Sequence, residues 1–241
     1  MTTLKQRVLA GERLHGGLLR LPSENLLEMA AVAGLDYAVI DCEHGPADLL
    51  SLQQHLQIAD AHGLPVLVRV GEREPALVLR VLDLGAQGVI VPHVDTPEQA
   101  REVVAAAHYP PLGERGFATY SRAGRFGTNS IAEHLAQAER TTMVVPMLET
   151  PQACDNASEI LAVEGVDTVL VGPADLSVAM GRSGPSEPDV AARLAQVVEA
   201  AGGAPLMTIV GSTEQGAQAP PGMVLFNLTH ILMHLLRSLK S

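Results

Sequence analysis

The stretch DYAVIDCEHGPADLL, residues 36–50, passes from a short apolar run into a cluster of polar residues and then into a helical pattern. Its apolar part is continuous rather than alternating, which is typical of a strand buried on both faces of a parallel sheet. Asp41, Glu43 and His44 stand where the apolar run ends. Taken alone, this stretch fits a solvated turn as well as a functional site, so the other strand ends must be compared.

The same pattern recurs along the whole chain. Short apolar runs predict strands at residues 15–21, 36–43, 65–70, 88–94, 142–148, 168–173, 205–211 and 223–228. Helical spacing predicts helices at residues 23–34, 47–63, 74–86, 96–107, 151–162, 189–203, 212–218 and 229–239. Eight strand–helix units with buried parallel strands predict a (β/α)8 TIM barrel of the α/β class. No linker interrupts residues 1–241, so a single domain is expected.

Composition narrows the range of partners. The formal net charge is −11, and a nucleic acid or an anionic membrane surface would require a positive footprint instead. No run has the length and apolar character of a signal peptide or a membrane span. Cys42 and Cys154 are too far apart in sequence for a metal knuckle and are interpreted as small buried residues. We therefore expect a cytoplasmic protein that binds small molecules.

Charged residues follow several of the predicted strands. In a TIM barrel the loops after the strands carry the chemistry, so these residues are expected to converge on one mouth of the barrel. Asp41, Glu43 and His44 stand at the end of the second predicted strand, and Arg69 at the end of the third. Glu149 follows the fifth strand, and Asp175 follows the sixth. Solvated turns would not produce this convergence so selectively. The sequence therefore predicts an active site at the carboxyl ends of the strands.

Glu149 and Asp175 are the candidate metal ligands. Hard carboxylate oxygens suit Mg²⁺ or Mn²⁺, with Co²⁺ or Zn²⁺ as further options, and leave coordination positions for water and substrate. The alternative is that these two carboxylates pair with loop arginines.

Arg69, His44 and Asp41 are the candidate catalytic residues. The guanidinium of Arg69 suits a carboxylate or a developing oxyanion, although it could also form a structural salt bridge. His44 can transfer a proton near neutral pH, and Asp41 could fix the tautomer of its ring.

The lysines argue against a Schiff-base mechanism. The chain contains only Lys5 and Lys240, one near each terminus, and neither is expected inside the barrel. The sequence also lacks a GxxxxGK[ST] loop and a strand-linked GxGxxG. We therefore expect a divalent metal ion, rather than a lysine, to stabilise the negative charge that develops on the substrate.

A long segment at residues 108–130 is rich in glycine and arginine. Long loops in compact domains are often lids or binding loops. Arg115, Arg122 and Arg125 could fold over the barrel mouth, or over that of a neighbouring subunit, and attract an anionic substrate. Alternatively, they form salt bridges at a subunit interface.

Several blocks together resemble a known family. The blocks IDCEHGPAD, VRV, LDLGAQGVIVPHVDTPEQA, HYPPLGERG, MLETPQA and VGPADLSVAMG are similar to successive blocks of the HpcH/HpaI family. These are metal-dependent class II pyruvate aldolases, typified by 4-hydroxy-2-oxoheptanedioate aldolase, on a phosphoenolpyruvate/pyruvate-type barrel. The resemblance covers about residues 10–185.

The resemblance implies roles for individual residues. Glu149 and Asp175 match the metal ligands, Arg69 matches the arginine that binds the 2-oxo acid, and Asp41 with His44 matches the proton-transfer dyad. The substrate carboxylate would be received by the segment Gly172, Pro173 and Ala174.

The resemblance also implies an assembly and a reaction. The assembly would be a homo-hexamer, a trimer of dimers with the last helix exchanged, in which Asp83 approaches a neighbouring site. The reaction would cleave or form 4-hydroxy-2-oxo acids from pyruvate and an aldehyde. Two alternatives remain: a citrate synthase-like condensing enzyme of siderophore biosynthesis, and a non-catalytic metabolite-binding barrel.

Four positions depart from the family pattern or vary within it. The chain has no tryptophan, so Leu19 and Arg20 form a different wall at the first strand. Arg20 could contact a carboxylate or lie on the surface. Met147 stands where glutamine is frequent, and His93 occupies a variable position for which we favour a structural role.

Overall fold

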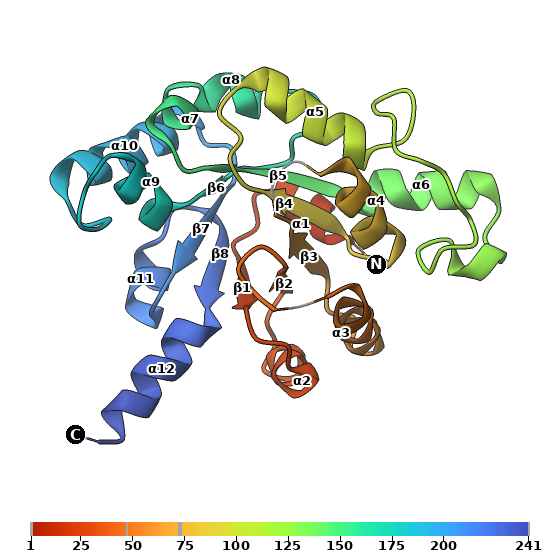
Figure 1. Ribbon diagram of the computed structural model, residues 1–241, viewed down its shortest axis with the longest axis horizontal. Helices are drawn as coiled ribbons and strands as arrows, with labels where there is room; N and C mark the ends of the chain where they lie inside the picture. The colour runs from red at the N-terminus through yellow and green to blue at the C-terminus, as the bar shows by residue number, and fades with distance from the viewer. Residues whose placement is uncertain (1, 47, 72–73, 241) are drawn as a thin grey trace.

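The computed structural model describes residues 2–46, 48–71 and 74–240. Within these ranges eight parallel strands close into a barrel in chain order, and β1 pairs with β8 (Figure 1). The predicted TIM barrel is therefore confirmed. The strands are β1 Leu14–Leu19, β2 Tyr37–Asp41, β3 Val66–Arg69, β4 Gly88–Val91, β5 Met143–Leu148, β6 Leu170–Val171, β7 Leu206–Val210 and β8 Gly222–Asn227.

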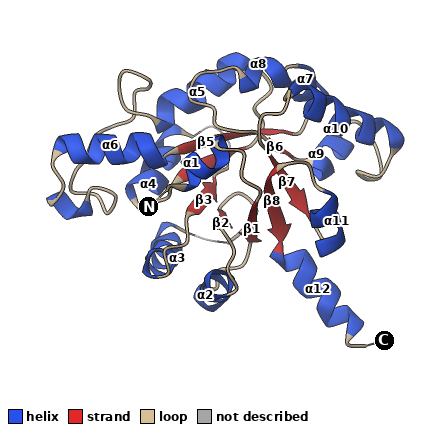
Figure 2. Cartoon of the chain, turned by 180° about the vertical axis from the view of Figure 1, so that it is seen from behind, coloured by secondary structure: helices blue, strands red, loops and turns tan. Residues whose placement is uncertain are grey.

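Helices surround the strands, and the last helix extends away from the barrel (Figure 2). Of the described helices, none has the length and apolar character that a bilayer crossing requires. The helices are α1 Leu4–Leu9, α2 Glu24–Val32, α3 Leu49–Ala61, α4 Pro75–Asp83, α5 Pro97–Ala107, η1 Arg125–Gly127, α6 Ile131–Thr141, α7 Pro151–Asp155, α8 Ala157–Leu161, α9 Pro173–Ala179, α10 Pro188–Ala200, α11 Thr213–Gln218 and α12 Leu228–Ser238.

The structure corrects several predicted boundaries. The sixth strand is shorter than predicted, because Gly172 already caps the amino end of α9. The predicted helix at residues 151–162 is divided into α7 and α8 at Asn156. Helices α1, α6 and α9 were not predicted, although α1 and α6 each begin with a capping box, at Thr3 and at Ser130.

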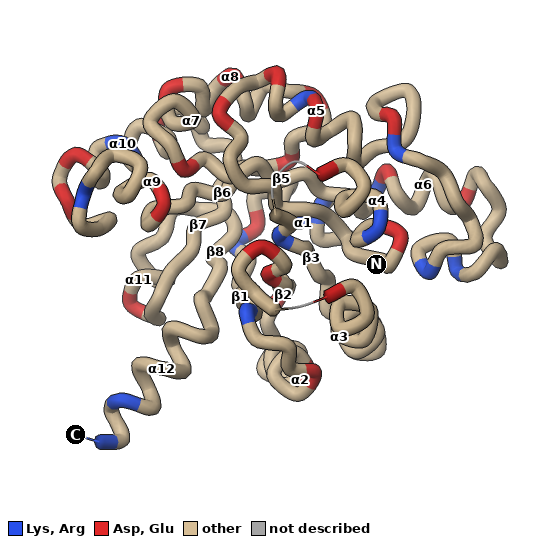
Figure 3. Tube along the Cα trace, in the orientation of Figure 1, with Lys and Arg blue, Asp and Glu red and all other residues tan. Residues whose placement is uncertain are grey.

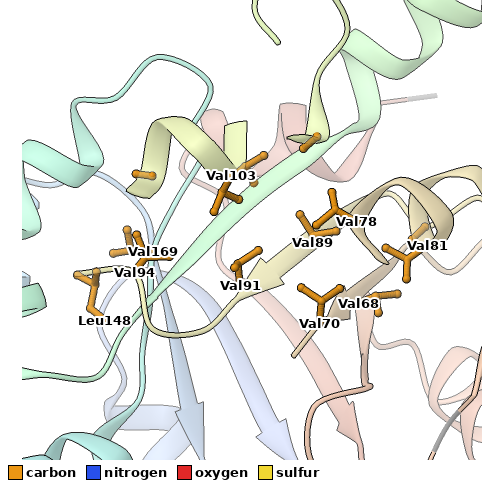
Figure 4. Close-up of a cluster of buried hydrophobic side chains, with 14 of the residues drawn as sticks. Val68, Val70, Val78, Val81, Val89, Val91, Val94, Val103, Leu148 and Val169 are labelled. Atoms are coloured by element: carbon orange, nitrogen blue, oxygen red, sulfur yellow. The ribbon is translucent and has the colours of Figure 1, made fainter. Parts of the chain in front are cut away.

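Two apolar clusters hold the barrel together. Side chains that point outward from the strands pack against the helices, as the valines of β3, β4, α4 and α5 show in Figure 4. Side chains that point inward fill the barrel and form a separate cluster. This division follows from the alternation of side chains along each strand. Cys154 is buried, Cys42 is half-buried, and burial raises the pKa of both thiols to about 11.

Helix α1 closes the amino end of the barrel. Leu4 and Val8 belong to the interior cluster. Between them, Lys5 Nζ lies 3.0 Å from Asp167 Oδ1 and donates a hydrogen bond to the Thr142 carbonyl at 3.0 Å. Both partners precede strands, so Lys5 is held at the end opposite the carboxyl ends of the strands. This position agrees with the expectation that Lys5 does not form a Schiff base in the barrel mouth.

Gly16 leaves room for the fully buried Tyr37 ring inside the barrel. The two residues are paired in register between β1 and β2, and a Cβ on Gly16 would overlap the ring. The ring cannot move aside easily because it is completely buried.

We predict that Gly16→Ala lowers the free energy of unfolding by about 1–3 kcal/mol, because overpacked cores force backbone shifts. Gly184→Ala is the matched control, since a Cβ at Gly184 would meet nothing within 4 Å. Urea denaturation of both variants measures the effect. Equal stability of the two variants would contradict the packing account.

Candidate active site

Asp41 is the fully buried centre of the site at the carboxyl ends of the strands. It is the last residue of β2, and the register pairs it directly with Arg69, the last residue of β3. Arg69 Nε donates to Asp41 Oδ1 at 2.9 Å, and Arg69 Nη2 donates to Asp41 Oδ2. Both side chains are buried, so the register of two neighbouring strands creates an ion pair inside the barrel.

Asp41 also organises the turn that follows β2. The backbone N–H groups of Glu43 and His44 donate to Asp41 Oδ1 at 3.1 and 3.2 Å. Arg20 Nε, directly after β1, donates to Asp41 Oδ2 at 3.0 Å. A Cβ at Gly45 would overlap the Asp41 carbonyl and lie 2.8 Å from the Arg20 carbonyl. One carboxylate therefore joins the ends of β1, β2 and β3, where Figure 3 shows charged positions of both signs.

Both members of the buried pair are ionised. Burial alone would raise the pKa of Asp41, but the hydrogen bond and charge of Arg69 lower it below its ordinary value. Burial alone would lower the pKa of Arg69, but the hydrogen bond and charge of Asp41 raise it. The site therefore contains a guanidinium whose position and charge are both fixed.

Glu43 lies between Arg69 and His44. Arg69 Nη1 lies 3.1 Å from Glu43 Oε2, and His44 Nε2 lies 3.7 Å from the same oxygen. Glu43 Oε2 is buried and accepts no hydrogen bond from the described residues. The side chain of His44 is 55% exposed. Sequence reasoning expected Asp41 to orient the His44 ring, whereas the structure brings Asp41 to the His44 backbone and Glu43 to the ring.

Glu149 is buried directly after β5, and His93 holds its orientation. The His93 N–H donates to Glu149 Oε1 at 2.8 Å, and His93 Nδ1 lies 3.1 Å from the same oxygen. His93 has a φ of 54°, a left-handed conformation that a residue with a side chain rarely adopts. A Cβ at Gly172 would lie 3.1 Å from Glu149 Oε2, so this glycine keeps the other side of the carboxylate accessible.

Asp175 is exposed in the first turn of α9, next to Gly172, Pro173 and Ala174. Burial is the main cause that raises the pKa of Glu149, and the negative charges of Asp175 and Glu43 raise it further, against the opposing effect of His93. Glu43, after β2, and Asp175, in α9, therefore both act on Glu149 across the mouth. Among the described residues, no group of three or more His, Cys, Asp or Glu side chains has an arrangement that could hold a metal ion by itself.

A divalent cation fits this set of residues. Glu149 has one oxygen next to the Cβ-free Gly172, Asp175 is exposed, and their negative charges are close enough to affect each other. Two hard carboxylate ligands leave positions that water or a chelating substrate can fill.

Glu43, Met147 and His93 were named from the sequence, but their partners in the site were not predicted. Met147 Sδ lies 3.9 Å from Arg69 Nη1, at the position where we noted the missing glutamine. His93 lies inside the predicted strand at residues 88–94, whereas β4 ends at Val91, so the shorter strand is what makes His93 a strand-end residue.

The arginine-rich segment lies at the opposite end of the barrel. It connects α5 to β5 through α6, and such helix-to-strand connections lie at the amino ends of the strands. Arg122 donates to the Leu84 carbonyl at 2.9 Å and pairs with Asp60, and both partners stand where helices end. Arg125 has a φ of 53° at the start of η1. The expectation that this segment covers the mouth of its own barrel is therefore wrong, because the segment is attached to the other end.

Asp83 is also part of this opposite end. It accepts a hydrogen bond from Arg115 Nη2 at 2.7 Å, and Arg115 lies over the Tyr109 ring at 4.7 Å. Neither Asp83 nor Arg115 reaches the site of its own barrel. A contact of Asp83 with a neighbouring subunit stays a prediction.

Fold and site define the class: a (β/α)8 barrel with a polar site of arginine and carboxylates at the carboxyl ends of its strands. The model of the HpcH/HpaI aldolase/citrate lyase family matches residues 18–219, and the chain belongs to this family.

Curated relatives carry aldolase names. The chain is 42% identical over 197 residues to a hydroxypyruvate/pyruvate aldolase of Pseudomonas aeruginosa, covering 80% of this chain and 72% of the relative. It is 41% identical over 178 residues to a 2-keto-3-deoxy-L-rhamnonate aldolase of Escherichia coli O9:H4. That match covers 73% of this chain and 66% of the relative, just under two thirds of its length.

Solved structures share the fold over nearly the whole chain. An HpcH/HpaI aldolase/citrate lyase family protein of Burkholderia cenocepacia J2315 has a TM-score of 0.90 and 33% identity, covering 98% of this chain and 96% of its own. The citrate synthase SbnG has a TM-score of 0.86 and 27% identity, covering 100% and 97%.

We predict that Asp41→Asn destabilises the protein by about 3–5 kcal/mol, because removing one charge of a buried pair deprives the buried Arg69 of its main partner. The matched control is Asp48→Asn in the same connection, where an exposed aspartate caps α3 and asparagine caps equally well. Urea denaturation at neutral pH is the measurement. A loss of stability in Asp41→Asn no greater than in the control would show that the pair does not hold the strand ends together.

Proposed function

We propose that the protein is a divalent-metal-dependent pyruvate aldolase that cleaves or forms 4-hydroxy-2-oxo acids. The observation that carries this proposal is the fixed Arg69 guanidinium facing a mouth that also contains Glu149 and Asp175. The aldolase names of the relatives support the same reaction class. The substrates are a small 2-oxo acid and an aldehyde.

Glu149 and Asp175 would hold the metal ion, with Mg²⁺ or Mn²⁺ favoured by their oxygen ligands and Co²⁺ or Zn²⁺ as alternatives. When bound, the ion would polarise the keto group of the 2-oxo acid and favour negative charge on its oxygen. His93 keeps Glu149 oriented, because the same carboxylate oxygen accepts its N–H. The exposed Asp175 needs no rearrangement of the core to bind a cation.

Arg69 and the start of α9 would bind the 2-oxo acid. The Gly172 N–H already donates to the Leu148 carbonyl at 3.1 Å, and Pro173 has no N–H. The first N–H groups of a helix have no partner within the helix, so Ala174 offers its N–H to the substrate carboxylate. Arg69 adds a positive charge at the oxygen that becomes negative when the C–C bond breaks.

His44 would accept and donate the proton of the substrate's 4-hydroxyl group. Its ring is accessible at the mouth, and its backbone is fixed by the hydrogen bond to Asp41. In cleavage it takes the hydroxyl proton, directly or through water, and in condensation it returns a proton to the aldehyde oxygen. Glu43 Oε2 lies 3.7 Å from His44 Nε2 and orients the ring.

A citrate synthase-like condensation is the second candidate. The likeness to SbnG over the full chain favours it, since the same barrel could polarise oxaloacetate for attack by an acetyl thioester. A non-catalytic metabolite-binding barrel is a third possibility. Assays with pyruvate plus aldehydes and with oxaloacetate plus acetyl-coenzyme A separate the first two, and binding without any turnover identifies the third.

The proposal includes a homo-oligomer, a trimer of dimers. Helix α12 projects from the barrel and exposes Leu232, Met233, Leu235, Leu236 and Leu239, which supports a partner for this helix. A cytoplasmic location and the absence of nucleic-acid or membrane partners belong to the same proposal.

We predict that a chelator abolishes the condensation of pyruvate with aldehydes and that added Mg²⁺ or Mn²⁺ restores it. Borohydride reduction in the presence of pyruvate should leave no adduct on the protein, because Lys5 is occupied at the other end of the barrel. Product mass and intact-protein mass measure the two outcomes. A covalent adduct on a lysine would overturn the proposed mechanism.

We also predict opposite effects of Glu149→Gln on binding and on stability. Calorimetric titration should show loss of metal binding in this variant and in Asp175→Ala. The metal-free Glu149→Gln protein should nevertheless unfold at a higher temperature than the wild type, because a buried negative charge near Glu43 and Asp175 is removed. Unchanged metal affinity in both variants would place the ion elsewhere.

A further inference from the structure

Arg20 is the one charged residue bound to Asp41 that the proposed mechanism leaves without a role. It is the first residue after β1, and its Nε donates to Asp41 Oδ2 at 3.0 Å. The side chain is 34% exposed, whereas Asp41 is fully buried. The guanidinium therefore lies at the border between the buried ion pair and the open mouth.

Arg20 and Arg69 differ in the hydrogen-bond donors that remain available. Arg69 directs Nε and Nη2 to Asp41, and its Nη1 lies 3.1 Å from Glu43 Oε2. Arg20 uses Nε, while its two Nη nitrogens donate no hydrogen bond to the described residues. Two adjacent Nη groups form a planar pair of donors that matches the oxygens of a carboxylate or a phosphate.

The order of the strands places Arg20 on the side of the acceptor. In the closed barrel β1 lies opposite β5, which is followed by Glu149. A 2-oxo acid bound by Arg69 and the start of α9, beside Glu149 and Asp175, would have its carboxylate and keto oxygens on that side, and its reacting methyl carbon would face the ends of β1 and β2. An aldehyde whose oxygen is near His44 would then direct its other end towards Arg20.

We propose that Arg20 is a specificity-determining residue that binds an anionic group, a carboxylate or a phosphate, on the acceptor aldehyde. This inference rests on the proposed aldolase function. Arg20 lies at the mouth of its own barrel, whereas Arg122 lies at the other end. Coverage of a neighbouring subunit's mouth by the arginine-rich segment, or salt bridges at a subunit interface, stay predictions. No covalent bond to Arg20 forms or breaks during the reaction, because the guanidinium acts only as a charged hydrogen-bond donor.

Paired aldehydes that differ in charge test the proposal. The pairs are 4-oxobutanoate with butanal, and glyceraldehyde 3-phosphate with glyceraldehyde, each condensed with saturating pyruvate. Arg20→Gln is expected to lower kcat/KM for the charged member about 10- to 100-fold more than for the neutral member. Arg20→Lys keeps the charge without the planar pair of donors and should fall between the two, while the KM for pyruvate stays unchanged.

Arg101→Gln is the matched control, because Arg101 is an exposed residue of α5 that pairs with Glu98. A larger effect on one pair of aldehydes identifies the anionic group as carboxylate or phosphate. Equal losses for both members of each pair would overturn the proposal, because Arg20 would then act through Asp41. If the wild type condenses pyruvate with none of the four aldehydes, the proposed function itself is refuted.

Discussion

The buried carboxylate of Asp41 is the constraint on which the site depends. A fully buried charge is tolerated only when it is paired and hydrogen-bonded, and Asp41 accepts from two arginines and two backbone N–H groups. These partners come from the residue after β1, from the turn after β2 and from the last residue of β3. The positions of Arg20, Arg69 and His44 are therefore consequences of satisfying one carboxylate.

The side of the mouth around Glu149 concentrates negative charge, whereas the charge of Asp41 is paired. Glu149 is buried with a raised pKa, near the charges of Glu43 and Asp175. A site that concentrates like charges is less stable than an apolar replacement would be, and such local conflicts are typical of functional sites. The left-handed backbone of His93, which delivers an N–H to Glu149, is a second conflict in the same place. A cation bound there would resolve the first conflict by giving the carboxylates a shared partner.

The fold could be predicted because the strands of a parallel barrel are continuous apolar runs, and their number and spacing are visible in the sequence. Helices α1, α6 and α9 were missed because each is additional to the alternation of one strand with one helix. The convergence of Asp41, Arg69 and Glu149 was predictable from their positions at strand ends. The bond between Asp41 and the His44 backbone, and the attachment of Arg122 to the far end of the barrel, depend on tertiary contacts that no local pattern contains.

The central claim is that this mouth stabilises negative charge on a 2-oxo acid. The most direct measurement incubates the protein with pyruvate in D₂O without an aldehyde and follows the mass of pyruvate over time. The account predicts that deuterium enters the methyl group only when Mg²⁺ or Mn²⁺ is present, and that Arg69→Ala slows this exchange strongly. Absence of exchange with the metal-loaded wild type, or the same exchange rate after the metal is removed, would contradict the account.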